Sequence, residues 1–180
     1  MAMGVSVRVM TPGECVNACA EMLSRVLMQT EASVLLEGLE HRDPGAVPLA
    51  GLCLSPGHEL LVAEYSMTPV GMARVRTSPG RASGAASWYC EPRVVAFDLL
   101  MVEPAMRGLG IGATLLEALA VRAGTHGADE LSCDLPIAAA DEIAWLRRHG
   151  FRPVERVERT TRTRVVLSRT LDADALQRAA

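Results

Sequence analysis

The sequence predicts a single α/β domain of the α+β kind, with about four helices flanking a mixed, mostly antiparallel sheet of about seven strands. Three observations lead to this prediction. The chain's 180 residues fit one domain. Its 49% hydrophobic and 22% charged content is that of a folded chain. Strand-like and helix-like apolar patterns alternate along it. We therefore expect one domain over residues 1–180, with 172–180 as a frayed tail.

The first elements are a strand and two helices. Residues 5–10 alternate β-branched and polar side chains, which favours a strand with one buried face. Thr11, Pro12 and Glu14 have the spacing of a capping box with proline at the first helical position, so a helix should begin there. A second, short helix is expected over residues 32–39.

Two strands and two loops follow. The runs 59–65 and 70–77 are rich in β-branched residues and are joined by a short polar connection, which predicts a hairpin. Prolines and glycines break regular structure over 41–57, and small residues do so over 78–87. We interpret both segments as loops within the domain.

A buried strand and an amphipathic helix come next. Residues 93–102 are almost all apolar, which is typical of a central strand covered on both faces. After a glycine-rich turn, residues 112–123 place leucines on one helical face. Gly124 is expected to end this helix.

The last part of the chain predicts a strand, a helix and two further strands. The strand covers 130–135, and the helix covers 138–149 with basic residues in its last turn and a glycine just beyond. Residues 151–157 and 162–171 then indicate two strands, expected to pair antiparallel.

Charge composition excludes several functions. A net charge of −3 and a pI near 5.8 provide no overall positive field, so we expect no nucleic-acid partner. All 18 basic residues are arginines. A chain without lysine has no Schiff-base lysine, lysine general base or P-loop lysine.

The cysteines indicate structural thiols. The five are scattered and none forms a C-x-x-C pair, so we expect no metal site and a reducing, cytoplasmic environment. No segment reaches the roughly 18 uncharged apolar residues of a membrane span, and residues 1–10 lack a secretory cleavage pattern. The sequence therefore predicts neither secretion nor a membrane partner.

The turn between the buried strand and its helix carries the functional signal. Arg107, Gly108, Gly110 and Gly112 lie within one short segment that ends at a helix N-terminus. Glycines allow positive φ and close backbone approach, while the first helical N–H groups are unpaired and carry positive partial charge. This combination predicts a pyrophosphate cradle. Arg107 could add a bond to a phosphate or could instead fix the loop.

The same segment resembles the GNAT superfamily of CoA-dependent N-acetyltransferases. The family's signature is Arg or Gln, two residues, Gly, one residue, then Gly or Ala, and residues 107–112 match it. Val102-x-Pro104 before it, the leucine pair after it, and Gly150 with its following phenylalanine extend the likeness. The order of elements matches over about residues 5–170. The resemblance implies a GNAT fold and acetyl-CoA, or another acyl-CoA, as co-substrate.

Two other interpretations were weighed for this turn. Three glycines could simply make a tight strand-to-helix connection. Gly108-x-Gly110-x-x-Ala113 also fits a dinucleotide fingerprint, with Asp134 about 20 residues further on. That fold needs further βαβ units after the fingerprint, whereas only one helix and two hairpin-like strands follow Asp134.

The resemblance also implies where the co-substrate lies. In the family, the strand before the glycine loop and the strand after its helix splay apart and admit the pantetheine arm; here these are 93–102 and 130–135. Backbone groups of the first strand would hold the arm, and the loop would hold the pyrophosphate. The implied contacts are Leu100, Met101 and Val102 for the arm, and Arg107, Gly108, Leu109, Gly110, Ile111, Gly112 and Ala113 for the phosphates.

The acid–base groups are less determined. An attacking amine must lose a proton, and Asp98 and Glu103 are the nearest carboxylates, although a regular strand would point them to opposite faces. The family often has an acidic tyrosine four residues before the Gly150 position, where this chain has Leu146. The remaining possibilities are that Tyr89, Cys133 or solvent donates a proton to the thiolate, or that the reaction uses no acid at all.

The expected activity is transfer of an acetyl or other short acyl group to a primary amine, with no metal. The acceptor, a small molecule or a peptide, stays open. A catalytically silent CoA-binding or regulatory module of the same fold is the alternative. Members of the family often form homodimers, so the resemblance also implies a homodimer here.

Overall fold

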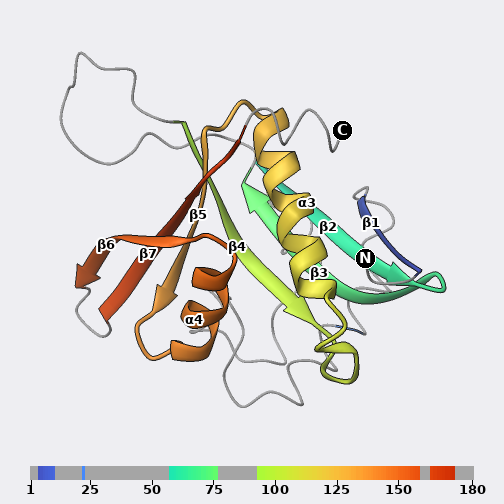
Figure 1. Cartoon of the computed structure of the whole chain (residues 1–180). Helices are drawn as coiled ribbons and strands as arrows, with labels where there is room; N and C mark the ends of the chain where they lie inside the picture. Colours follow the sequence, from blue (N-terminus) through green and yellow to red (C-terminus); the bar gives the residue numbers. More distant parts are fainter. Residues whose placement is uncertain (1–3, 11–21, 23–56, 77–92, 159–162, 173–180) are drawn as a thin grey trace.

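A computed structural model describes residues 4–10, 22, 57–76, 93–158 and 163–172 (Figure 1). The expected helices beginning at Thr11 and over 32–39 lie outside these residues, as do most of the loop 41–57 and all of 78–87. The described elements are β1 (Val5–Val9), β2 (His58–Tyr65), β3 (Thr68–Arg76), β4 (Val94–Val102), the 3₁₀ turn η1 (Pro104–Met106), α3 (Ile111–Thr125), β5 (Glu130–Pro136), α4 (Ala140–Arg148), β6 (Arg152–Glu158) and β7 (Thr163–Thr170).

The seven strands form one sheet in the order β1-β2-β3-β4-β5-β7-β6. Every neighbouring pair is antiparallel except β4 and β5, which are parallel. The predicted mixed, mostly antiparallel sheet of seven strands is therefore confirmed. The described ranges hold two of the about four expected α-helices, α3 and α4. No helix within those ranges is long and apolar enough to span a bilayer.

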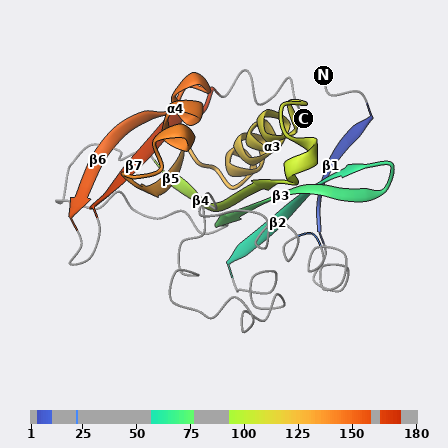
Figure 2. The same cartoon turned by 90° about the horizontal axis from the view of Figure 1, so that it is seen from below.

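Helix α3 packs on one face of the sheet and buries the main core (Figure 2). Its residues Leu115, Leu116 and Leu119 are fully buried, as the three-and-four spacing predicts. The helix lies close to β3 because Gly71 has no side chain: a Cβ there would lie 2.9 Å from Leu115 Cδ1. Core strand residues such as Phe97 face the same layer, and Phe97 meets Phe151 edge to face.

The end of α3 differs from the sequence prediction. Gly124 does not end the helix, which runs through Thr125 and has His126 as its C-cap. Gly127 has φ 75°, so it adopts the left-handed conformation expected just beyond a helix. The prediction was wrong because glycine is tolerated inside a well-packed helix, and a second glycine three residues later has the terminating conformation.

An ion pair ties α3 to β2 and should make stability depend on acid. Arg122 donates to Glu59 through Nε and through an NH2 nitrogen, the latter at 2.7 Å. These hydrogen bonds from Arg122 hold the pKa of Glu59 below its ordinary value of 4.5, against the opposing effect of burial. The pair's contribution is thus present above about pH 4.5 and is lost as pH falls through the lower folded-state pKa.

We expect Glu59→Gln to lower the melting temperature at pH 7, by an amount that corresponds to about 1 kcal/mol. The difference from wild type should shrink as pH falls below about 4.5, because protonation of Glu59 then removes from the wild type the charge that the variant already lacks. Calorimetric melting between pH 3 and 7 measures this. Glu64→Gln breaks the pair with Arg8, an arginine that is more exposed than Arg122, and is the matched control. A difference in melting temperature that stays constant from pH 3 to 7 would show that the charge of Glu59 is not its cause.

Candidate active site

The turn between β4 and α3 contains two glycines in the left-handed conformation. Gly108 has φ 80° and Gly110 has φ 82°. A Cβ built at either would meet no atom within 4 Å, so the space in front of both is open. Helix α3 then begins at Ile111, where the first N–H groups have no partner within the helix. The turn therefore presents backbone donors and the positive end of a helix toward open space.

Strands β4 and β5 part beside this turn. They pair only from Val94 to Ala96 and from Glu130 to Ser132. Beyond that the strands diverge, and their ends point to opposite sides of the molecule with α4 lying in front of the gap (Figure 1). The splayed pair expected from the sequence is present in the structure.

A bulge in β4 lies at the point of divergence. Leu99 is the partner of Arg74 and Phe97 is the partner of Val75, so Asp98 has no partner on β3. The extra residue resets the alternation of the strand. Phe97 packs in the core under α3, and so does Leu100 three residues later.

A pocket of about 380 Å³ occupies the space between the end of β4, the glycine turn and α4. Eight of the ten residues expected to hold the co-substrate line it. The remaining two, Leu109 and Ala113, do not, and Leu109 is exposed. The lining consists of Leu100, Met101, Val102, Met106, Arg107, Gly108, Gly110, Ile111, Gly112, Asp141, Glu142, Trp145 and Arg148.

Helix α4 supplies a wall of the pocket that the sequence reasoning missed. Asp141, Glu142, Trp145 and Arg148 all line it. Their spacing places them on one side of a helix, so the periodicity of residues 138–149 was the available signal. The Trp145 ring fits closely against the turn, because a Cβ on Gly112 would lie only 3.3 Å from Trp145 Cζ2. Gly112 thus lets the indole lie close to the turn, since a Cβ there would have to displace the ring by a few tenths of an ångström.

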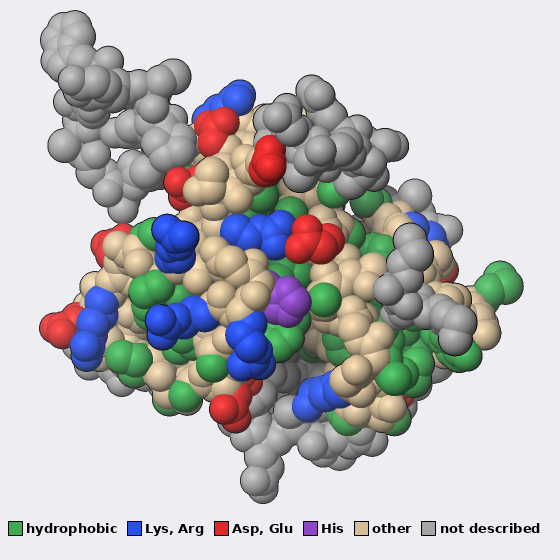
Figure 3. Space-filling model, viewed as in Figure 1, with side chains coloured by type: hydrophobic (Ala, Val, Ile, Leu, Met, Phe, Trp, Pro, Cys, Tyr) green, Lys and Arg blue, Asp and Glu red, His purple; other side chains and the backbone are tan. Residues whose placement is uncertain are grey.

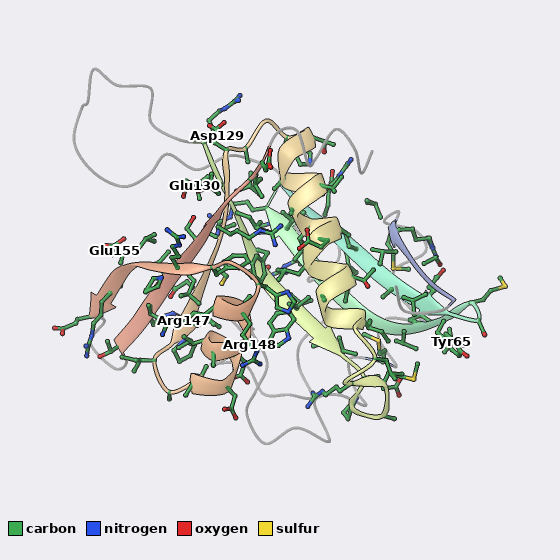
Figure 4. The ribbon with its side chains drawn as sticks, in the orientation of Figure 1. Tyr65, Asp129, Glu130, Arg147, Arg148 and Glu155 are labelled. Atoms are coloured by element: carbon green, nitrogen blue, oxygen red, sulfur yellow. The ribbon has the colours of Figure 1, made fainter. Side chains whose placement is uncertain are left out.

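Basic groups gather on this side of the molecule. Arg147 and Arg148 are exposed on α4 (Figure 4). Figure 3 shows several arginine side chains around the place where α4 lies beside α3. Arg107 is exposed and its Nε donates to the carbonyl of Val102 at 3.3 Å, so this arginine helps to hold the turn. Such groups suit an anionic ligand.

The expected acid–base residues are not gathered in this pocket. Asp98 lies on the opposite face of the sheet, where both carboxylate oxygens accept from Arg74 at 2.7 Å and His58 Nε2 lies 3.7 Å away. Glu103 follows β4, and its backbone N–H donates to Val70 O at 2.9 Å. Tyr89 lies outside the described residues.

Two further positions from the sequence analysis belong to the core. Leu146 is fully buried and does not line the pocket, whereas its neighbour Trp145 does. Cys133 is also buried under α3. Burial, and to a lesser degree the charge of Asp134, raises the pKa of the Cys133 thiol well above its usual range. Among the described residues, no cluster of three His, Cys, Asp or Glu side chains could hold a metal ion.

The sequence matches a family model described as the acetyltransferase (GNAT) family over residues 26–151, which is more than half of the chain. The chain belongs to the GNAT acetyltransferase family. No curated protein matches it.

Solved structures of other GNAT proteins share the fold. A GNAT family acetyltransferase from Elizabethkingia anophelis with acetyl-CoA bound is 15% identical, with a TM-score of 0.61 over 94% of this chain and 99% of the other. The putative acetyltransferase yncA from Salmonella typhimurium with acetyl-CoA is 20% identical, with a TM-score of 0.62 over 94% and 95%. A putative GNAT acetyltransferase from Desulfovibrio desulfuricans is 16% identical, with a TM-score of 0.65 over 93% and 99%.

Proposed function

We propose that this protein binds acetyl-CoA, or another short acyl-CoA, and transfers the acyl group to a primary amine. The observation that supports this most is a single pocket lined by the end of β4, the glycine turn and α4, beside the place where β4 and β5 stop pairing. Acetyl-CoA is bound in two of the similar GNAT structures. The pocket of this chain has the elements that a pyrophosphate and an extended thioester arm require.

Different residues of the pocket would bind the pyrophosphate and the pantetheine arm of such a ligand. Backbone N–H groups from Gly108 to Gly112 and the start of α3 would bind the pyrophosphate. The exposed edge of β4 at Leu100, Met101 and Val102 would pair with the amide groups of the arm, because β5 does not pair with β4 there. Arg107 holds the turn and adds positive charge beside the phosphates.

The chain would contribute orientation and charge to the transfer. The bound thioester supplies the activated acyl group, and backbone N–H groups of β4 would stabilise the oxyanion that develops on its carbonyl. The attacking amine has to be neutral. Asp98, Glu103 and Tyr89 stay our candidates for proton transfer.

The proposed function is tested by thiol release from acetyl-CoA with a panel of amines, with mass gain of the acceptor as the second readout. We expect amine-dependent release of free CoA. A protein that binds acetyl-CoA but releases no free CoA with any amine of the panel would instead be a silent CoA-binding module. The homodimer and the cytoplasmic location expected from the sequence stay predictions.

Proton delivery to the departing thiolate should not depend on Cys133. Its thiol is buried in the core and its pKa is raised, which makes it a weak acid. We expect Cys133→Ala and Tyr89→Phe each to change kcat by less than about tenfold, below the usual effect of removing a general acid. Steady-state kinetics measure this. A loss of about 10²-fold in Tyr89→Phe, with KM for acetyl-CoA unchanged, would show that Tyr89 is the acid.

A further inference from the structure

Buried polar side chains gather on the face of the sheet that lies opposite α3. On β5, Leu131, Cys133 and Leu135 point into the core under α3, so Ser132 and Asp134 point to the other face. The described part of the chain has four buried polar or charged residues, and by the strand pairing all four lie on that other face: Arg74, Ser132, Arg164 and Ser168.

One arginine–aspartate pair lies on each side of the gap between β4 and β5. Arg74 holds Asp98 with two hydrogen bonds of 2.7 Å. On the other side, Arg164 Nε lies 2.9 Å from Asp134 Oδ2. Nη2 of the same arginine donates to the backbone carbonyl of Asp134 at 2.9 Å. The arginine side chains are only 9% and 8% exposed, so both pairs are largely shielded from water.

Asp98 and Asp134 lie just beyond the last paired residues of β4 and β5, where the two strands begin to separate. The last paired residues of the two strands are Ala96 and Ser132. Asp98 and Asp134 are each two residues further along their strands and on the same face. Two carboxylates therefore face the side of the gap opposite α3, while Leu100 and Val102, just beyond Asp98, line the pocket on the α3 side.

One oxygen of this arrangement lacks a partner. Asp134 Oδ1 is buried and accepts no hydrogen bond from any described residue. Asp98 differs, since both its oxygens accept from Arg74. A buried carboxylate oxygen without a donor costs free energy, and buried polar atoms in native proteins nearly always have a partner. A ligand that brings an N–H donor would supply one.

We propose that this polar side of the gap binds the acceptor, and that Asp134 is the residue that selects it by binding its amino group through Oδ1. The inference rests on the proposed function. The acceptor class is a primary alkylamine, which is cationic at neutral pH and donates several hydrogen bonds. Asp134 Oδ1 is a carboxylate acceptor with no donor among the described residues, which an ammonium group fits and an anion does not.

The test compares cationic with uncharged amines. Wild-type protein is assayed by thiol release at pH 7.5 with cadaverine, spermidine and glycinamide as alkylamines and with aniline as a weakly basic arylamine. We expect at least one alkylamine to be used with higher kcat/KM than aniline. Use of aniline but of no alkylamine would overturn the inference and leave the proposed function intact, whereas no thiol release with any amine would defeat the proposed function.

The deciding variant is Asp134→Asn. It keeps the shape of the side chain and removes its charge, so we expect kcat/KM for the preferred alkylamine to fall about tenfold or more, mainly through KM for the amine. The Kd for acetyl-CoA, measured by calorimetry, should stay within about twofold, because Asp134 does not line the described pocket.

The matched control is Glu130→Gln. Glu130 lies on the same strand and face but at the closed end of the parallel pair, where it accepts from Ser168 at 2.6 Å (Figure 4). We expect its amine kinetics to match wild type. Equal kinetics in Asp134→Asn and Glu130→Gln would overturn the inference and leave the proposed function intact. Failure of wild type to bind acetyl-CoA would instead defeat the proposed function.

A second variant, Asp134→Glu, tests the proposal if Asp134→Asn does not fold. Removing the charge of Asp134 leaves Arg164 with less compensation, so Asp134→Asn could unfold below the assay temperature. Asp134→Glu keeps the charge and moves the carboxylate by one methylene. We expect it to fold and to raise KM for the amine while leaving Kd for acetyl-CoA unchanged. A folded Asp134→Glu with wild-type KM for the amine would also overturn the inference.

Discussion

Gly110→Val should lower the affinity for acetyl-CoA by about 10²-fold, an effect comparable to removing one or two charge-assisted hydrogen bonds. A Cβ at Gly110 meets no protein atom within 4 Å, so the added side chain would enter the open space where we place the pyrophosphate. The φ of 82° also strains a β-branched residue, which costs about 1–2 kcal/mol of stability. Calorimetric titration with acetyl-CoA measures the affinity.

The control for backbone strain is Gly4→Val. Gly4 has φ 83°, and a Cβ there would meet only the ring of Tyr65, at an ordinary 3.5 Å. Gly4 precedes β1 and does not line the pocket. We expect this variant to bind acetyl-CoA as wild type does. A folded Gly110→Val with unchanged affinity would show that the pyrophosphate does not bind at this turn.

Leu146→Tyr should destabilise the protein by about 3 kcal/mol or more, because Leu146 is fully buried in the core between α4 and the sheet. The larger ring would strain the packing, and its hydroxyl would be buried where leucine has no polar group. We expect a lower melting temperature and no increase in kcat. Thermal melting and thiol-release kinetics on the same preparation measure both.

Trp145→Tyr is the companion variant. It places a phenol at the neighbouring position, which lines the pocket, and it removes volume where the indole packs against Gly112. We expect a folded protein with altered KM for acetyl-CoA. If Leu146→Tyr instead folds well and kcat rises strongly, position 146 faces the thiolate and the structural placement of α4 is wrong.

The order of elements and the glycine turn were predictable because each rests on local sequence. Strand alternation, the leucine spacing of α3 and the glycines at 108 and 110 all act within a few residues. The turn's place beside the splayed strands followed from the family resemblance. The parallel pairing of β4 with β5 agrees with it.

The position of Asp98 was not predictable from alternation alone. Asp98 was chosen from the sequence as one of the two nearest carboxylates, but the Arg74 side chain that binds it comes from another strand. The bulge that leaves Asp98 without a register partner in the pairing of β4 with β3 depends on contacts over long range. The same limit applies to Asp134, whose arginine is 30 residues away.

The wall formed by α4 was missed for a related reason. Local periodicity identifies a helix and its two sides, yet Asp141, Trp145 and Arg148 face the pocket only because α4 lies in front of the gap. Leu146 was compared with a family tyrosine by its distance from Gly150. Burial in the structure, which sequence spacing does not report, places it in the core.

The central claim, that the glycine turn and the open edge of β4 form an acyl-CoA site, is tested most directly by calorimetric titration of the wild-type protein with acetyl-CoA and, separately, with NAD. Both ligands carry a pyrophosphate, but only acetyl-CoA has an arm that can pair with Leu100, Met101 and Val102. We expect saturable binding of acetyl-CoA at one site per chain and no measurable binding of NAD. Absence of binding to acetyl-CoA, or equal affinity for the two ligands, would contradict it.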